Sequence, residues 1–375
     1  MKVKCIFIIL FCFFITYDLH PEIFWDGNFY EQALLSFKGN KNIRMTYMGL
    51  SILDLKLDTR PSELVRVKSE LEYALAHQKD NPLLVSENLE SLALNTLNAS
   101  ITPEDFKFTI GRFLPAWGKA KIFRPLDLFI PQTYFLNMLS FRGIDGISAK
   151  YYVSDLSSVE LLAIPSMDVR HIMPSIDLSS NSSFSNAIDH TVVAANIEIH
   201  ITPFDNNLIL LHDASSGNNL FGFTFKGDAI IGLWSELFYS LGKNSEKNFR
   251  ASVGADWSFA KYYFLAIEYF YDESGTSDHT KYSRLMASVP RMTFGRQYLM
   301  FDFNILNYTE LNFGITYLGN LLDASFVLFP YFRYEMLANC FLGLSLYHFN
   351  GRAGREFSPD LLGNYILNTY LLVRF

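Results

Sequence analysis

A distinctive basic and aromatic segment of the sequence lies between positions 114 and 142. Four cations stand against a single carboxylate, Asp127, in a stretch that also contains Trp117; the cations are Lys119, Lys121, Arg124 and Arg142. Rings of arginine and lysine around a water-filled passage favour anionic solutes. If this stretch folds into the interior of a wide fold, it predicts a positively charged constriction. The alternative is a cap or plug whose cations pair with carboxylates of the surrounding wall.

No catalytic or metal-binding constellation accompanies this stretch. In the segment His348 to Arg352, the position two residues after the histidine is Asn350, and an amide cannot act as an acylated nucleophile. The eight histidines are scattered without the spacing of metal ligands. Residues Gly217 to Gly222 lack the Lys-Ser/Thr pair of a phosphate-binding loop. We therefore expect neither an enzyme nor a cofactor or metal site.

The elements that position these residues are expected to be β-strands. Apolar and polar residues alternate with a period of two in many segments, most clearly in Glu63 to Leu75 and Phe249 to Phe259. Such alternation places one face of a strand in an apolar environment and the other in water. No segment with the period of a helix stands out.

The composition favours a membrane barrel over a helical membrane protein. Of the 375 residues, 18% are charged and 16% are aromatic, whereas about 25% of a soluble globular protein is charged. After the N-terminus, no apolar run approaches the roughly 20 residues that a spanning helix needs. Transmembrane barrels combine these features because only alternate residues face lipid and aromatic girdles lie at both interfaces. The formal net charge of −7 argues against a nucleic-acid partner.

The alternation predicts an all-β, transmembrane, antiparallel up-and-down barrel of about 18 strands. The predicted strands cover residues 29–38, 43–58, 62–76, 91–101, 104–113, 143–154, 157–166, 187–202, 206–214, 218–227, 229–242, 248–259, 262–273, 297–307, 310–318, 321–332, 337–349 and 363–375. Bacterial single-chain barrels have an even number of strands. Weak alternation in Asn206 to Ala214 and Leu321 to Phe332 leaves sixteen as the neighbouring count.

The lengths of the connections agree with eighteen strands. Every long connection follows an odd-numbered strand; these connections are 77–90, 114–142, 167–186, 274–296 and 350–362. Outer-membrane barrels have short periplasmic turns and long extracellular loops. If the first strand runs outward, all five long loops are extracellular, and 114–142 is the one expected to fold into the lumen.

The last stretch, Asn364 to Phe375, alternates and ends on an aromatic residue. It resembles the closing strand of bacterial outer-membrane β-barrels, whose terminal Phe, preceded by alternating apolar residues, is read by the barrel assembly machinery. The resemblance implies an assembly signal and two partners, that machinery and outer-membrane lipid. The signal residues would be Tyr365, Leu371, Val373 and Phe375.

The segment around the fifth strand resembles porin-like outer-membrane proteins, including uncharacterised and alginate-export-like barrels. In these, Gly-Arg-Gln at a strand end is followed by Trp-Gly and Pro-x-Asp before a long loop; here the residues are Gly111-Arg112-Phe113, Trp117-Gly118 and Pro125-Leu126-Asp127. The resemblance implies a porin-like transport role. With the charges predicted to face inward nearby, the expected constriction and selectivity residues are Arg66, Lys68, Lys107, Arg112, Trp117, Lys119, Lys121, Arg124, Asp127 and Arg142.

Residues 1–20 are predicted to be a signal peptide, leaving 21–375 as a single barrel domain in the cell outer membrane. Two lysines precede the apolar stretch Cys5 to Ile15, which is too short to span a bilayer. Removal of this segment would leave Cys340 as the only cysteine, so that the mature chain could form no internal disulfide.

The predicted function is passive diffusion of small hydrophilic solutes through a porin-like channel, with a preference for anions. Two alternatives stay open. A transporter specific for a hydrophobic or oligosaccharide ligand would use inward aromatic residues, namely Tyr152, Tyr262, Phe264, Tyr298 and Tyr370. A surface adhesin or structural barrel would use the long loops. Porins of this size are often trimers, so a homotrimer is among the expected assemblies.

Overall fold

The computed structural model describes residues 22–38, 44–79, 88–129, 143–165, 191–214, 216–228, 230–242, 247–282, 293–308, 310–359 and 363–375. These residues contain 18 strands. The strands are β1 (Glu22–Lys38), β2 (Arg44–Arg60), β3 (Val65–Lys79), β4 (Asn88–Ile101), β5 (Phe106–Phe113), β6 (Ile144–Tyr152), β7 (Ser158–Ile164), β8 (Val192–Ile201), β9 (Phe204–Asp213), β10 (Asn218–Asp228), β11 (Gly232–Leu241), β12 (Lys247–Phe259), β13 (Tyr263–Asp272), β14 (Gln297–Tyr308), β15 (Leu311–Asn320), β16 (Ser325–Leu337), β17 (Cys340–Asn350) and β18 (Tyr365–Arg374).

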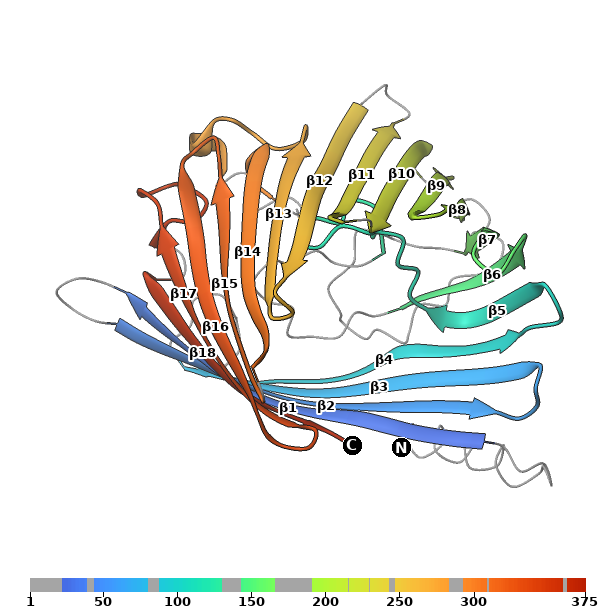
Figure 1. Ribbon diagram of the computed structural model, residues 1–375, viewed down its shortest axis with the longest axis horizontal. Coiled ribbons are helices and arrows are strands. Elements are labelled where there is room, and N and C mark those ends of the chain that lie inside the picture. The colour runs from blue at the N-terminus through green and yellow to red at the C-terminus, as the bar shows by residue number, and fades with distance from the viewer. Residues whose placement is uncertain are drawn as a thin grey trace.

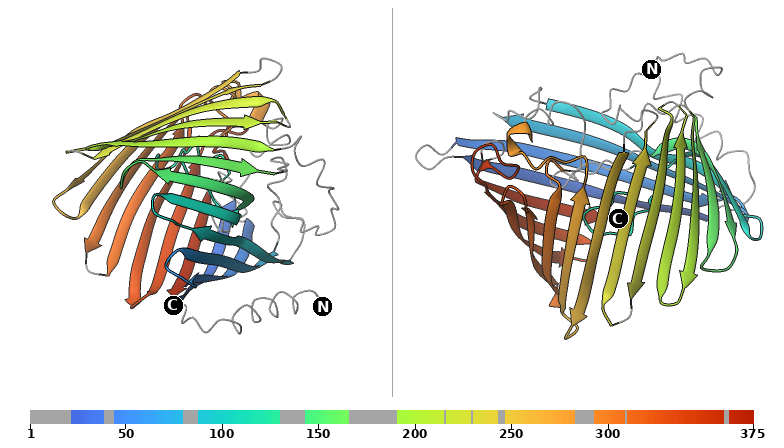
Figure 2. Two further views of the ribbon diagram at one scale, coloured as in Figure 1. Left: turned by 90° about the vertical axis from the view of Figure 1, so that its right-hand side faces the viewer. Right: turned by 90° about the horizontal axis from the view of Figure 1, so that it is seen from above.

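The strands form one closed antiparallel barrel. Each strand pairs with its neighbours along the chain, and β18 pairs with β1, so the sheet has no free edge. Figures 1 and 2 show the resulting ring of tilted strands. The fold class predicted from alternation is confirmed, and the sixteen-strand alternative is excluded.

The first strand begins earlier than predicted, at Glu22 instead of Phe29. Residues Glu22 to Asn28 continue the antiparallel register with β2, from Arg60 to Asp54. The polar segment Asp26-Gly27-Asn28 interrupts the apolar alternation, which is why the sequence pattern missed this part of β1.

The barrel closes where the end of the chain meets Gly27. The amide of Gly27 donates a hydrogen bond to the carbonyl of Phe375 at 2.8 Å, and the Phe375 amide donates to the Gly27 carbonyl at 3.0 Å. A Cβ atom at position 27 would lie 2.6 Å from the Phe375 ring. Only glycine leaves room for the terminal ring at this position. The predicted pairing of the last strand with the first is confirmed, in the register Asn28 to Arg374 through Phe37 to Tyr365.

The two faces of the wall have opposite character. Large apolar side chains are exposed on the outside, as with Leu161 on β7 and Val253 on β12. Buried polar residues on the inner side include Thr224 and Glu236, on the neighbouring strands β10 and β11. This arrangement, apolar outward and polar inward, is that of a barrel in lipid with a wet interior.

The long connections follow β3, β5, β7, β13 and β17, and short turns follow the even-numbered strands. Since antiparallel neighbours alternate in direction, the strand ends that these five connections join lie at one end of the barrel, as predicted. The described residues include one short 3-10 helix, η3 (His279–Lys281). No helix in the part of the chain that the structure describes is long and apolar enough to cross a membrane.

Candidate functional site: a loop held inside the barrel

The segment after β5, residues 114–129, runs inside the ring of strands, and we call it the inner loop. In Figure 1 it is the teal stretch that leaves β5 and crosses the interior. Four of its large apolar side chains are buried, namely Trp117, Phe123, Leu126 and Phe129, and Phe123 and Leu126 are fully buried. The prediction that this long loop folds into the lumen is confirmed for the part that the structure describes.

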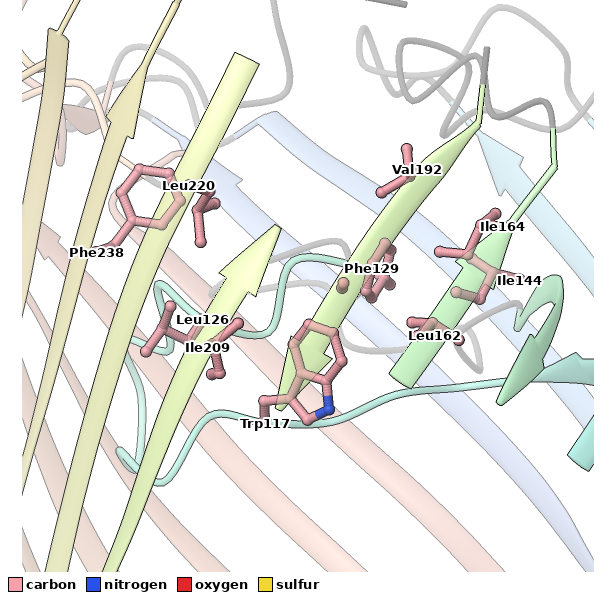
Figure 3. Close-up of a cluster of buried hydrophobic side chains, with 11 residues drawn as sticks. Trp117, Leu126, Phe129, Ile144, Leu162, Ile164, Val192, Ile209, Leu220 and Phe238 are labelled. Atoms are coloured by element: carbon pink, nitrogen blue, oxygen red, sulfur yellow. The ribbon is translucent and has the colours of Figure 1, made fainter. Parts of the chain in front are cut away.

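One group of inner-loop side chains packs on the wall between β6 and β11 (Figure 3). Trp117 meets Phe129 edge to face, with ring centroids 5.6 Å apart. Around Leu126, Gly222 of β10 leaves space, because a Cβ there would lie 2.4 Å from a Leu126 methyl group. The wall residues of this first cluster are Ile144, Leu162, Ile164, Val192, Ala194, Ile209, Leu220 and Phe238.

The tip of the inner loop packs on a second stretch of wall, between β13 and β17. The ring of Phe123 lies parallel to that of Phe270, with centroids 4.4 Å apart and planes inclined by 4°. Tyr298 adds a third ring, 5.6 Å from Phe123. The remaining residues of this second cluster are Met300, Leu318, Val327, Phe349 and Phe357. The two clusters fix the loop to the wall at both its ends and its tip.

Two buried glutamates of the wall hold the backbone of the inner loop, and we call them the carboxylate cradle. Glu236 of β11 accepts hydrogen bonds from the amides of Lys119, Ala120 (2.5 Å) and Leu126 (3.3 Å). Glu268 of β13 accepts from the amides of Lys121 (2.9 Å) and Phe123 (2.7 Å) and from the indole Nε1 of Trp234 (2.9 Å).

The cradle supplies the hydrogen-bond acceptors that the buried backbone of the inner loop needs. An irregular segment buried away from water has amide groups without strand or helix partners, and each must find an acceptor. A carboxylate can accept several such bonds at once, and charge-assisted bonds are stronger than neutral ones. Asp127 does the same within the loop by accepting from the Gly118 amide at 2.6 Å. The arrangement therefore fixes the backbone of the loop as well as its side chains.

The cations of the inner loop pair with carboxylates. Lys121 Nζ lies 2.8 Å from Asp256 of β12 and 3.8 Å from the centre of the Phe264 ring. Lys119 Nζ lies 3.9 Å from Glu198 of β8. Arg124 lies 3.6 Å from Asp127 and donates to the carbonyl of Ala120 at 2.6 Å. The structure thus brings Lys119, Lys121, Arg124 and Asp127 together, with wall carboxylates offsetting much of their charge.

A second group of cations, the basic wall cluster, lies on β3, β5 and β6. Its members are Arg66, Lys68, Lys107 and Lys150. Arg66 is bonded to Asp58, and Lys68 lies 3.9 Å from the same carboxylate. Lys107 and Lys150 are directly opposite in the register of β5 and β6. Lys150 pairs with Glu198 at 2.8 Å, whereas Lys107 has no ion-pair partner within 4.0 Å among the described residues. Glu198, shared with Lys119, connects this cluster to the inner loop.

Arg112 lies on the outer face of the barrel and not with the other predicted constriction residues. On β5 the exposed residues are Phe106, Phe108 and Ile110, and Arg112 has the same parity. Its guanidinium pairs with Asp145 of β6, at 2.9 Å and 2.6 Å. Sequence proximity to the loop motif suggested a role in the pore, but strand alternation turns this side chain outward.

The other predicted positions are placed as follows. Arg142 lies outside the described residues, as does the predicted signal peptide. On β18 the even-numbered residue Asn368 is buried and faces inward, so the odd-numbered side chains face outward. The predicted signal residues all have odd numbers and lie on this outer face; they are Tyr365, Leu371, Val373 and Phe375. Their role as an assembly signal stays a prediction.

A second segment, residues 351–359 after β17, also reaches the second cluster. Phe357 is buried there, and Glu356 accepts hydrogen bonds from Asn320 Nδ2 (2.8 Å), the Phe294 amide (3.3 Å) and the Tyr298 hydroxyl. Desolvation raises the pKa of the Glu356 carboxyl to about 7. Tyr298 therefore contacts both the inner loop, through Phe123, and this second segment.

The cradle is the main feature that sequence reasoning missed. Neither Glu236 nor Glu268 is among the site residues predicted from the sequence. A signal was present, because both glutamates lie between apolar residues on inward faces: Trp234 and Phe238 flank Glu236, and Ala266 and Phe270 flank Glu268. A carboxylate among buried apolar side chains must have donors.

Comparison with known proteins places the fold. No protein-family model and no curated protein sequence matches the chain. Among solved structures, Pseudomonas aeruginosa OccK11 (OpdR) is 11% identical with a TM-score of 0.58, over 94% of this chain and 96% of that one. Salmonella typhi OmpF, solved with daunomycin, is 12% identical with a TM-score of 0.52, over 96% and 99%. A mutant of the Rh. blastica porin is 11% identical with a TM-score of 0.50, over 94% and 100%.

The chain has a porin fold. At these identities the likeness concerns the fold alone, and it extends over nearly the whole of each chain. The partial Trp-Gly and Pro-x-Asp loop pattern is not itself tested by these structures. The inner loop, its carboxylate cradle and the basic wall cluster together form the candidate functional site of this barrel.

Proposed function

We propose that this protein is an outer-membrane channel for the passive diffusion of small hydrophilic solutes. The observation that carries the proposal is the inner loop, which narrows the lumen and is bonded to Glu236 and Glu268. Barrels of 16–18 strands are wide enough to leave an aqueous passage. A loop fixed on one side of such a lumen reduces the cross-section of the lumen and can leave a passage beside it. Size exclusion by the wall and the loop is then the mechanism, with no catalytic step, cofactor or metal.

The proposal includes a preference for anions in the sector of the basic wall cluster. The cations of the inner loop are largely neutralised by Glu198, Asp256 and Asp127. Lys107 supplies the least compensated positive charge, because its cross-strand neighbour Lys150 is also a cation. Cations lining a passage lower the free energy of anions passing close to them. Lys107, rather than the loop cations, is therefore the proposed selectivity residue.

The proposal also includes the outer membrane as the location. The apolar outer face suits lipid, and Phe375 ends the chain at the closing seam, as the resemblance to assembly signals implies. Residues 1–20 are proposed as the cleaved signal peptide, and the barrel assembly machinery and outer-membrane lipid as partners. A homotrimer is the proposed assembly to test first.

The direct test is reconstitution of the purified full-length mature chain into planar lipid bilayers. We expect stepwise, ohmic conductance that falls when larger polyethylene glycols are added. Specific cell binding without any conductance would overturn the channel and favour the adhesin. Tight retention of one ligand without conductance would favour a specific transporter instead.

A further inference from the structure

Four tyrosines occupy the inner side of adjacent strands across the seam of the barrel. They are Tyr331 on β16, Tyr347 on β17, Tyr370 on β18 and Tyr30 on β1, and each is half-buried. Their inward orientation follows from strand parity, because they alternate with outward residues and share a face with buried polar residues such as Gln32, Ser345 and Asn368. We call these four residues the tyrosine ladder.

The strand register places the four tyrosines at successive levels along the wall of the barrel. Tyr347 is opposite Ile366 of β18, and Tyr331 is opposite Ser345, which is opposite Asn368. Tyr30 is opposite Leu372. On the scale of β18, the ladder therefore occupies positions 366, 368, 370 and 372. Each step is two residues, or about 6–7 Å along a strand.

The rings of two of these tyrosines lie on glycines of the neighbouring strand. A Cβ on Gly343 would lie 2.0 Å from Cε1 of Tyr370, and one on Gly314 would lie 2.5 Å from Cζ of Tyr331. An aromatic ring that covers a strand glycine lies along the wall instead of standing out from it. The other face of such a ring is turned to the lumen. Tyr30 continues the surface, with its ring centre 5.4 Å from that of Tyr370.

Side-chain amides and hydroxyls accompany the rings. Gln32 Nε2 donates to Asn368 Oδ1 at 2.7 Å, and Asn368 Nδ2 donates to Ser345 Oγ at 3.1 Å. The hydroxyl of Tyr331 donates to Asn304. Two charged residues of opposite sign adjoin the rings. Asp302 lies on β14, and Arg333 faces inward two residues after Tyr331 on β16, opposite Gly343, the glycine under the Tyr370 ring. The ladder therefore presents aromatic faces and neutral hydrogen-bonding groups beside one cation and one anion.

From this geometry we propose that the tyrosine ladder is a binding lane for neutral saccharides. A sugar ring has an apolar C–H face that fits an aromatic face, and a rim of hydroxyls that suits amides and phenolic hydroxyls. Since Asp302 and Arg333 have opposite signs, they give a charged solute no net attraction. The inference rests on the proposed channel, and it names a solute class that the basic wall cluster does not serve.

The lane also has a direction. Tyr347 packs against the second cluster, where the inner loop and Phe357 meet the wall. Tyr331, Tyr370 and Tyr30 follow it step by step toward the end of the barrel at which the chain terminates. A saccharide that has passed the inner loop would therefore contact the four tyrosine rings one after another along the wall.

The test uses a linear gluco-oligosaccharide of six units with the full-length protein. In bilayers we expect the glucan to interrupt the current reversibly, and in detergent we expect calorimetric binding. Tyr370→Ala should weaken glucan affinity about three- to tenfold, as loss of one aromatic contact implies. Tyr370→Phe should retain most of the affinity. Tyr331→Ala provides a second lane variant if the first does not assemble.

The matched control is Tyr317→Ala on β15. That tyrosine also covers a glycine, Gly319, but on the outer face, so its loss should leave glucan binding unchanged. Ohmic conductance without glucan interruption or binding would overturn the lane and leave the channel intact. Equal weakening by Tyr317→Ala, or binding of indole in place of glucan, would also overturn it. Glucan binding in detergent by a protein without conductance would support the lane and overturn passive diffusion.

Discussion

The carboxylate of Glu268 accepts a hydrogen bond from the amide of Phe123 at 2.7 Å, across 145 positions of the sequence. The Phe123 ring at the same time lies parallel to that of Phe270, two residues after Glu268 on β13. One strand thus binds both the backbone and the side chain at the tip of the inner loop. The position of the loop in the lumen depends on this double contact more than on its cations, whose ion pairs are partly exposed.

Glu268→Ala should release the tip of the inner loop. The amides of Lys121 and Phe123 and the Trp234 indole would lose their acceptor, and a buried donor without a partner costs about 1–3 kcal/mol. We expect loop docking to weaken by about 2–4 kcal/mol. Single-channel recording should show a larger and noisier conductance.

The control for this variant is Glu31→Ala. Glu31 is an exposed carboxylate on β1, opposite Leu371 and Ser51, and its neighbour Gln32 is the inward residue. Removing it changes the net charge equally without touching the loop, so conductance should be unchanged. Identical traces for Glu268→Ala and the unmodified protein would contradict the role of the cradle.

Phe123→Ala tests the aromatic half of the contact. The side chain is fully buried in the second cluster, and truncation of a buried phenylalanine typically costs about 3–5 kcal/mol. Because the truncation weakens docking of the loop, we expect rapid tryptic cleavage at Lys119 or Lys121, while the barrel itself stays resistant. Phe221→Ala, on the exposed outer side of β10, should leave the cleavage rate unchanged.

The strands could be predicted because their signal is local. In β12, observed as Lys247–Phe259, apolar and polar residues alternate almost without interruption, and the predicted segment 248–259 differs by one residue. The lengths of the connections then agreed with eighteen strands. The prediction failed at the start of β1, where pairing with β2 continues through polar residues that carry no alternation. Pairing of that kind depends on the neighbour and not on the segment itself.

The site was less predictable because its contacts are distant in sequence. Glu236 meets the amides of Ala120 and Leu126 across 116 and 110 positions, and no local pattern specifies such a meeting. Arg112 was assigned to the pore from its place in a motif. The alternation of its own strand, with Phe106, Phe108 and Ile110 exposed, opposes that assignment and should have taken precedence.

Lys107→Glu should reduce the preference for anions. Lys107 faces the lumen beside Lys68 and Lys150, and the exchange replaces a weakly compensated cation with an anion. Two units of charge at several ångströms in water imply a change in the ratio of anion to cation permeability of about two- to fivefold. The reversal potential in a salt gradient measures this ratio. Lys261→Glu, in the turn after β12, should have a much smaller effect, and an unmodified channel that is cation-selective would refute the preference.

Gly27→Val should impair closure of the barrel. A Cβ at this position would lie 2.6 Å from the Phe375 ring and 2.8 Å from the carbonyl oxygen of Asp54. Overpacking of this kind typically costs about 1–3 kcal/mol, and here it acts on the β1–β18 pair that closes the barrel. We expect a lower yield of heat-modifiable, folded barrel on gels. Gly354→Val, where a Cβ meets nothing within 4 Å, should strain only an exposed loop and leave that yield nearly unchanged.

Glu356 should make docking of the segment 351–359 dependent on pH. Its pKa is raised to about 7 when docked, because burial disfavours the charged carboxylate. In the undocked segment the carboxyl regains an ordinary pKa of about 4.3. Between these values the docked state binds more protons, so docking is strongest below about pH 4.3 and weakens as pH rises toward 7. The full difference corresponds to about 4 kcal/mol.

Tryptic cleavage at Arg352 and Arg355 measures this docking, since both residues closely precede Glu356 in the same segment. Cleavage should become faster, relative to the Glu356→Gln variant at the same pH, as pH is raised from 5 to 7.5. Glutamine keeps an acceptor for Asn320 and Tyr298 but does not ionise, so it removes the pH dependence and corrects for the pH profile of the protease. Glu335→Gln, in the turn region at the other end of β16, should behave like the unmodified chain. A constant ratio of the two cleavage rates across this range would mean that Glu356 is ionised in the docked segment, and that Tyr298 and Asn320 stabilise the charged form more than burial destabilises it.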